Sequence, residues 1–372
     1  MVYSVTHSVF MVGVTTFAEQ FPSFLFSVRG GIIADKYNRH TIILITQILS
    51  AAQAIILTIC AFSGNYSIAV ILALSVFLGI VNAYDVPVRQ SMINDIIENK
   101  DDLPNAVALN SSLNTLARLV GPALSGFLLA CYGAAFCFLS NAVSFIAVIA
   151  AIAAMKLPKN NHVVRNTKTS GKFKEGIDYL KANKPIAVII WISALSNFFV
   201  LSYVTLLPEY AKYVFKGDAT TYGWLTSSAG IGALVGAFYL ALLDKKANFR
   251  KIMWISILLT GISLLLFAYC YNFYLSLFFS ALCGLGAIGQ TSMMVTIVQN
   301  ETDALFRGRV VSFIAMSIFG MLPLGSLLVG YLAPLTGASF TLFAEGVIAI
   351  IISGSFYKSL LKTTFKQSEY GN

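Results

Sequence analysis

The composition of this sequence excludes an ordinary soluble protein. The chain has 372 residues, of which 57% are hydrophobic and only 11% are charged, and its mean hydropathy is +0.78. Soluble domains carry about 25% charged residues, so this chain has too few charges to cover two or three soluble domains. The apolar excess therefore predicts a protein that crosses a membrane many times.

Eleven apolar segments are long enough to span a membrane as helices, which takes about 20 residues each. Apolar residues occur on every face of these segments together with many Gly, Ala and Ser, which is typical of helices packed closely in lipid. The predicted fold class is therefore an all-α, polytopic membrane protein. The segments are Met11–Ile33, Thr41–Phe62, Ile68–Val88, Ala106–Ala130, Phe136–Met155, Ile186–Pro208, Tyr222–Leu243, Ile252–Cys270, Phe273–Gln299, Val310–Ala333 and Phe340–Tyr357.

Lysine and arginine alternate between rich and empty loops along the chain, except that one outer loop carries Lys212 and Lys216, which Glu209 and Asp218 offset. The loops at 63–67, 131–135, 271–272 and 334–339 contain neither residue, whereas the loops between them and the C-terminal tail are basic. Because cytoplasmic loops carry the Lys/Arg excess, we expect a plasma-membrane protein with a cytoplasmic C-terminus. The net charge of +9 then reflects topology and not a nucleic-acid surface.

Cysteine and histidine show no pattern of a metal centre or a disulfide framework. The five cysteines lie in or beside apolar runs, and the three histidines are scattered. Such cysteines are typical of small core residues. No Ser or Cys stands with a membrane-embedded His, and no phosphate-binding G-x-x-x-x-G-K-[ST] loop occurs. We therefore expect no metal, no cofactor and no enzymatic activity.

An internal repeat divides the chain into two halves. The segment 91–102 resembles 292–303, with five identical positions at an offset of 201. The second half has six spans and the first has five, so we expect the first helix of a twelve-span scheme to be missing. A short surface helix is expected at 171–181. The predicted parts are residues 1–157 (helices two to six), a basic linker at 158–185, residues 186–360 (helices seven to twelve) and a tail at 361–372.

Two matching bundles joined by a basic linker resemble the major facilitator superfamily of secondary transporters. The loop from Gly31 to His40 resembles the signature G-x-x-x-D-[RK]-x-G-R-R of that superfamily, with Asn38 in place of Gly and His40 in place of the last Arg. A basic turn that happens to contain an Asp is the alternative. The resemblance implies a cytoplasmic gate that includes Gly31, Asp35, Lys36 and Arg39.

The fifth helix of the scheme carries a second motif. Gly121, Pro122 and Gly126 resemble the G-P-x-x-G-G core of exporters in the superfamily, and a packing kink is the alternative. The segments 84–90, 103–110, 114–122 and 137–145 look like the branch of the enterobactin exporter, macrolide efflux proteins and lysophospholipid transporters. The central Arg of the fourth helix in many proton-coupled exporters is not evident, which weakens the case for proton coupling.

Several ionisable residues lie at membrane depth, where they are candidates for function. Glu19 lies about 12 Å into the first span and Arg118 near the middle of the fifth helix, where they could form a substrate or proton site or a structural pair. Asp85 and Arg89 lie one helical turn apart, and this spacing predicts either a gate or an intrahelical pair. Glu345 is a weaker candidate, near the outer end of the last helix and in reach of water.

Aromatic residues of the second half are candidates for lining a cavity, with packing against lipid as the alternative. They are Phe198, Phe199, Tyr203, Trp224 and Tyr239. The resemblance implies a secondary-active exporter of a small amphipathic or aromatic molecule, of siderophore or drug class, that works by alternating access. The expected partners are this small molecule, the lipid bilayer and a proton as a candidate coupling ion. A lysophospholipid translocator and a truncated, non-transporting member are the alternatives.

Overall fold

The structure, a computed structural model, describes residues 2–64, 67–97, 102–155, 169–243, 247–303 and 306–362. The described residues form helices and turns and no strand, as the all-α prediction requires. Ten helical segments among them are long and apolar enough to cross a membrane. The predicted span Ala106–Ala130 is also helical, within α5, although many of its side chains lie outside the described set. The polytopic fold class is thus confirmed.

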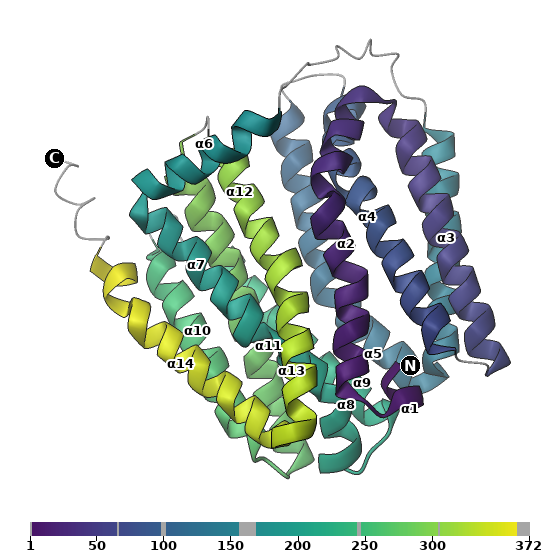
Figure 1. Cartoon of the computed structure of the whole chain (residues 1–372), viewed down its shortest axis with the longest axis vertical. Helices are drawn as coiled ribbons and strands as arrows, with labels where there is room; N and C mark the ends of the chain where they lie inside the picture. The colour runs from purple at the N-terminus through teal and green to yellow at the C-terminus, as the bar shows by residue number, and fades with distance from the viewer. Residues whose placement is uncertain are drawn as a thin grey trace.

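The first half of the chain consists of one short helix followed in sequence by four long ones (Figure 1). Helix α2 packs against α4, and α3 packs against both α4 and α5. The elements are α1 (Val2–Thr6), α2 (Val9–Lys36), α3 (Arg39–Ser63), α4 (Ile68–Ile96) and α5 (Leu103–Ala154).

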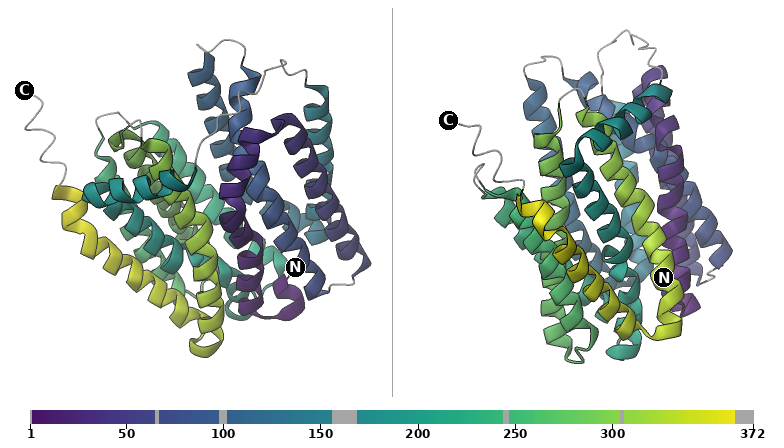
Figure 2. Two further views of the ribbon diagram at one scale, coloured as in Figure 1. Left: turned by 45° about the horizontal axis from the view of Figure 1, so that its top comes forward. Right: turned by 60° about the vertical axis from the view of Figure 1, so that its left-hand side comes forward.

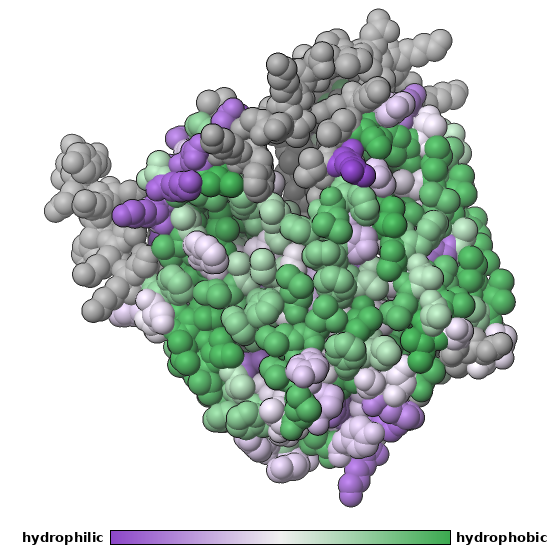
Figure 3. All heavy atoms as spheres, viewed as in Figure 1, coloured by the Kyte–Doolittle hydropathy of each residue, from purple (hydrophilic) through white to green (hydrophobic). Residues whose placement is uncertain are grey.

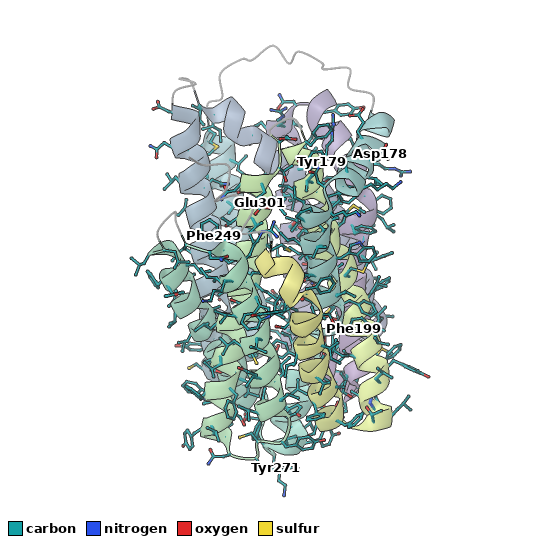
Figure 4. The ribbon with its side chains drawn as sticks, turned by 90° about the vertical axis from the view of Figure 1, so that its left-hand side faces the viewer. Asp178, Tyr179, Phe199, Phe249, Tyr271 and Glu301 are labelled. Carbon is teal, nitrogen blue, oxygen red and sulfur yellow. The ribbon has the colours of Figure 1, made fainter. Side chains whose placement is uncertain are left out.

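Glycines in the left-handed region reverse the chain at one end of the molecule, which we call the short-loop end. Gly64 ends α3 with φ of 67°, Gly133 bends α5 back on itself with φ of 78°, and Gly337 separates the last two helices with φ of 89°. Only glycine adopts such angles without steric cost. The opposite end, where the basic linker lies, is called the linker end. Figure 4 shows Tyr271 at the short-loop end and Tyr179 at the linker end.

The second half contains a surface helix and six membrane-spanning segments. Helix α10 packs against α11 and α14, and α9 packs against α11 and, in the other half, α5. The helices are α6 (Thr169–Ala182), α7 (Lys184–Phe199), α9 (Ala219–Ala241), α10 (Phe249–Ala268), α11 (Phe273–Glu301), α12 (Arg307–Met316), α13 (Leu322–Thr336) and α14 (Ala338–Lys362).

Two spans of the second half are interrupted. After α7 the chain passes through a 3-10 segment η2 (Leu201–Leu206), one turn α8 (Leu207–Glu209) and a π-helical turn η3 (Tyr210–Val214). A π-helical turn η4 (Ser317–Met321) separates α12 from α13. Such interruptions inside long helices are frequent at functional sites, and in transporters broken helices surround the binding site.

The exterior of the molecule is apolar along its length. Figure 3 shows hydrophobic residues over the middle and hydrophilic ones towards both ends. Large apolar side chains such as Trp191 (65% exposed) and Phe278 (57% exposed) point outward. In water this surface would aggregate, whereas in lipid it costs nothing. The interior core is largest in the second half, where Tyr210 and Phe267 are fully buried.

The predicted surface helix is confirmed as α6, which crosses the linker end of the second half (Figure 2). Glu175 pairs with Arg309 on α12 at 2.7 Å. The ring of Tyr179 stacks on Phe306 at 4.6 Å between centroids, and its hydroxyl accepts the backbone N–H of Asp303 at 3.2 Å. The end of the linker is therefore fastened to the beginning of α12.

Candidate functional site

Asp85 is a buried carboxylate that joins two helices of the first half. It is 4% exposed and accepts hydrogen bonds at Oδ1 from Thr46 Oγ1 (2.7 Å) and Gln47 Nε2 (2.8 Å), both on α3. Its Oδ2 pairs with Arg89 Nη2 one turn along α4 at 2.5 Å. The structure thus shows the intrahelical pair and adds the link to α3. A gate role for Asp85 and Arg89 stays a prediction.

We expect the hydrogen bond from Gln47, and not the ion pair, to make Asp85 important for stability. The Thr46 hydroxyl also lies 2.9 Å from the Ile43 carbonyl and can donate there instead. Asp85→Ala should therefore orphan the buried Gln47 amide and cost about 1–3 kcal/mol. Arg89→Ala should cost less, because the Asp85 carboxylate that it leaves buried keeps the hydrogen bonds from Thr46 and Gln47, whereas the Arg89 side chain is 59% exposed. Thermal unfolding of the purified variants in detergent measures both.

The double variant Asp85→Ala/Gln47→Leu provides the control for this prediction. It removes the orphaned amide along with its partner, so much of the lost stability should return. If Arg89→Ala is as damaging as Asp85→Ala, the ion pair carries the stability and the prediction is wrong.

The remaining gate candidates lie at the linker end of the first half. Gly31, Asp35 and Lys36 fall in the last turns of α2, but their side chains lie outside the described residues. Arg39 is half-buried at the beginning of α3. Their roles in a gate therefore stay predictions.

The two departures from the superfamily signature have a structural reason. Asn38 has φ of −63°, which needs no glycine, and its side chain caps α3 by accepting the backbone N–H groups of His40 (3.0 Å) and Thr41 (3.3 Å). The Nε2 atom of His40 lies 2.8 Å from the carbonyl oxygen of Ile152, near the end of α5. Both residues thus stabilise the beginning of α3.

A buried ion pair lies at the linker end of the second half. Arg250 in the first turn of α10 has a side chain only 7% exposed, and Glu301 ends α11 with a side chain 27% exposed. The contact is bidentate, with Arg250 Nε 3.1 Å from Glu301 Oε1 and Nη2 bonded to Oε2. Glu301 is not among the candidates predicted from the sequence. The pair fixes α10 to α11.

The structure does not bring the candidates Glu19 and Arg118 together within its described residues. Glu19 lies on α2 with an exposed side chain, while its backbone carbonyl faces α4 so closely that a Cβ on Gly79 would lie 2.2 Å from it. The side chain of Arg118, on α5, lies outside the described residues. A shared site for Glu19 and Arg118 stays a prediction.

The exporter-type motif falls within the first arm of α5. A Cβ on Gly121 would meet no described heavy atom within 4 Å, so no close approach to the described part of the chain depends on this glycine. The side chain of Pro122 and the surroundings of Gly126 lie outside the described residues. The function of the motif stays a prediction.

Glu345 does not reach water, contrary to the sequence-based expectation. It lies in the second turn of α14 and is only 3% exposed, because η2 and α7 pack against this helix. Its Oε1 lies 2.9 Å from the hydroxyl oxygen of Ser202, and its buried Oε2 has no partner among the described residues. The residues beside Glu345 in the sequence are mostly apolar and do not indicate which helices cover its side chain.

A polar cluster lies deeper in the second half. The Ser193 hydroxyl bonds to that of Ser317 on η4, and the Asn197 amide donates to the Ser193 carbonyl at 2.9 Å. An adjoining cavity of about 10 Å³ has room for one water. Ser196 and Gln290 line it, and the Ser196 hydroxyl and Gln290 Oε1 are buried without a partner in the described structure. The cluster joins α7 to the interruption in α12–α13.

The two halves meet along α5 and α9 and along α2 and α13. A Cβ on Gly13 would lie 2.4 Å from the Ser326 carbonyl oxygen, and one on Gly330 would lie 2.9 Å from Phe10 Cα. Glycine is therefore required for the helices to approach so closely. This glycine-lined contact closes the short-loop end.

Polar residues add to the contact at the edge of the short-loop end. Lys212 Nζ lies 2.6 Å from His7 Nδ1, between η3 and the α1–α2 turn. Tyr3 packs edge-on to His7 with centroids 6.5 Å apart. Burial and then the nearby charge of Glu209 raise the pKa of the Tyr3 hydroxyl well above its usual value. The segment before α2 is thus attached to the second half.

The predicted aromatic residues do not form one surface. Tyr203 is 3% exposed inside the second half, whereas Trp224 and Tyr239 on α9 are more than half exposed. Phe198 and Phe199 contact each other edge to face at 4.6 Å between centroids. The five residues therefore do not share a single lining.

Known proteins resemble this chain over most of its length. The family model described as transmembrane secretion effector matches residues 1–369. The staphyloferrin A transporter of Staphylococcus aureus (strain NCTC 8325 / PS 47) is 29% identical over 374 residues, which cover 98% of this chain and 92% of that protein. Macrolide efflux protein A of Streptococcus pyogenes is 20% identical over 336 residues, which cover 89% of this chain and 83% of that protein.

Solved structures give the same fold. The nucleoside transporter NupG superposes with a TM-score of 0.71 at 14% identity, over 96% of this chain and 93% of that one. The predicted resemblance is confirmed, as is the expectation of a small-molecule transporter of efflux type and not an enzyme. The chain belongs to the transmembrane secretion effector family of major facilitator transporters.

Proposed function

We propose that this transporter exports a small amphipathic or aromatic molecule, of siderophore or drug class, across the plasma membrane. The glycine-lined contact between α2 and α13 carries the proposal, because it joins the halves at the short-loop end through a surface that can separate without unfolding either half. The names of the staphyloferrin A transporter and macrolide efflux protein A support the two substrate classes. The basic loops favour a cytoplasmic linker end and C-terminus.

Alternating access then follows from rocking of residues 1–157 against residues 186–360. In this structure the short-loop end, which we place outside, is closed. Separation of α2 from α13 would open it, and the interruptions at η2 and η4 let the second half change shape locally. Substrate would bind between the halves near Glu19 and Arg118. The gate at the linker end would contain Gly31, Asp35, Lys36, Arg39, Asp85 and Arg89, and Gly121, Pro122 and Gly126 would shape the exporter-type helix.

Export supplies the direct test. Cells that lack their own exporters should accumulate less labelled macrolide or less siderophore when they express the chain, and efflux should collapse when a protonophore removes the proton gradient. The variants Glu19→Gln and Arg118→Gln should fold and lose efflux if they bind substrate. Faster movement of a lysophospholipid with neither macrolide nor siderophore efflux would replace the proposed substrate class.

The closed short-loop end makes a second prediction. In a chain whose native cysteines are replaced, a short bifunctional thiol reagent with a reducible link should join His7→Cys to Lys212→Cys, because the two side chains meet at the short-loop end, with Lys212 Nζ 2.6 Å from His7 Nδ1. Cross-linking should stop efflux, and a reducing agent should restore it. His7→Cys/Gly354→Cys is the matched control, since a Cβ on Gly354 meets no described atom within 4 Å. Full efflux by the cross-linked protein would contradict alternating access through this contact.

A further inference from the structure

The hydrogen bonds around Glu345 distinguish an acid from a carboxylate. The Ser202 hydroxyl lies 2.9 Å from Glu345 Oε1 and 3.1 Å from the Phe198 carbonyl oxygen. A serine hydroxyl has one hydrogen, so it cannot donate to both oxygens at once. If Glu345 carries a proton, the carboxyl O–H donates to Ser202 and Ser202 donates to Phe198, which satisfies all three groups.

An ionised Glu345 fits this environment poorly. A carboxylate at Glu345 would accept the single Ser202 hydroxyl hydrogen, so Ser202 could not donate to the Phe198 carbonyl. The charged, buried Oε2 would also have no partner in the described structure. Burying an unpaired charge costs far more than burying a neutral carboxyl group. The geometry therefore favours the neutral acid.

Among the residues that the structure describes, the groups that face Glu345 offer no compensating positive charge. Its titratable neighbours are Tyr203 on η2, Cys283 on α11 and Tyr210 on η3. The helices α7, α10 and α13 also surround this part of the bundle. Their charged residues all lie in first turns at the linker end, and they are Lys184, Arg250 and Lys251.

The same hydrogen bonds connect Glu345 to the contact between the halves. A Cβ on Gly325 of α13 would lie 2.0 Å from the Phe198 carbonyl oxygen, so α13 packs directly on the group to which Ser202 donates. The next residue, Ser326, presents its carbonyl to Gly13 of α2. A change at Ser202 therefore acts on the end of α7, on α13 and through it on the other half.

We propose that Glu345 binds a proton in the closed conformation and that loss of this proton loosens the α2–α13 contact. Glu345 lies within the first two turns of α14, near the short-loop end. Movement of η2 and α13, which pack on α14 there, would expose it to the outside when that end opens. An exporter driven by inward proton flow needs such a site, which loads outside and is closed off with its proton. The role of this proton in driving export rests on the proposed function, whereas its binding to Glu345 in the closed conformation does not.

Infrared difference spectroscopy of the purified protein between acidic and alkaline pH tests the bound proton. The carbonyl band of a protonated carboxylic acid should be present in the native chain and absent in Glu345→Gln. Ser202→Ala should keep the band but shift its frequency, because the carboxyl group loses its hydrogen-bond partner. This variant tests the proposal if Glu345→Gln does not fold. Glu209→Gln is the matched control and should keep the band. An unchanged spectrum in folded Glu345→Gln would show that Glu345 neither gains nor loses a proton between the two pH values and would overturn the proposal.

Cross-linking of His7→Cys/Lys212→Cys tests the coupling. Each rate is divided by the rate in the Glu345→Gln background at the same pH, because Glu345→Gln mimics the neutral acid and because the reacting thiolate itself increases with pH. This ratio should fall about fivefold or more from acidic to alkaline pH. A ratio independent of pH, or one that responds to sodium and not to pH, would overturn the coupling. Neither readout needs a transported substrate. If both hold and no compound is exported, the proposed function fails and the proton site stands.

Discussion

Replacing Gly13 with valine should open the short-loop end. A Cβ at this position would lie 2.4 Å from the Ser326 backbone carbonyl, and a backbone group cannot turn away as a flexible side chain can. Overpacking of this kind costs about 1–3 kcal/mol. In a transporter the halves can avoid this cost by separating, so the ratio of open to closed states should rise about 5- to 150-fold.

The rate of the His7→Cys/Lys212→Cys cross-link measures this shift, because the two thiols lie within reach of the reagent only in the closed state. Gly354→Val is the first control and should leave the rate unchanged, since no described atom lies within 4 Å of its Cβ position. Gly232→Val is the second control. Its Cβ would lie 1.7 Å from the Ala281 carbonyl inside the second half, so it should lower the folded yield and not redistribute the states. An unaltered cross-linking rate in Gly13→Val would contradict a closed α2–α13 contact.

The architecture could be predicted because span length and loop charge are local properties. The turn at Gly133 falls between two apolar runs, and the surface helix α6 falls within the basic linker. The interruptions within spans could not be predicted in the same way. The predicted span 186–208 stops at Pro208, but the chain continues through α8 and η3 to Val214. A proline tells where a helix is weakened and not whether a π-helical turn continues it.

The candidate site was only partly predictable, because burial and partners depend on tertiary packing. Asp85 and Arg89 are four residues apart, so their pair followed from helical spacing. Glu345 was expected to reach water because its position in the helix says nothing about what covers it. Its contact Ser202 lies 143 residues away in sequence. No local pattern gives such a contact without knowledge of how the helices pack.

Arg250 and Glu301 show the same limit and lead to a strong stability prediction. Removing Glu301 by Glu301→Ala leaves the guanidinium of Arg250 almost fully buried and unpaired, which should cost about 3–5 kcal/mol of folding free energy. Arg250→Ala should cost less, because the Glu301 side chain is 27% exposed and can be hydrated. Glu301→Ala is expected to cost more than Arg250→Ala because the charge that it leaves unpaired, on Arg250, is the one that water does not reach.

The double variant Arg250→Met/Glu301→Leu separates stability from function at this pair. Apolar residues of similar volume often replace a buried ion pair at no cost, so thermal unfolding in detergent should return close to that of the native chain. Lys251→Ala changes the exposed neighbour of Arg250 and should leave unfolding unaltered. If Glu301→Ala unfolds at the native temperature, the pair does not hold α10 to α11. Because α10 and α11 belong to the same half, recovered stability together with native efflux would identify the pair as structural, whereas recovered stability with lost efflux would place it in the gate at the linker end.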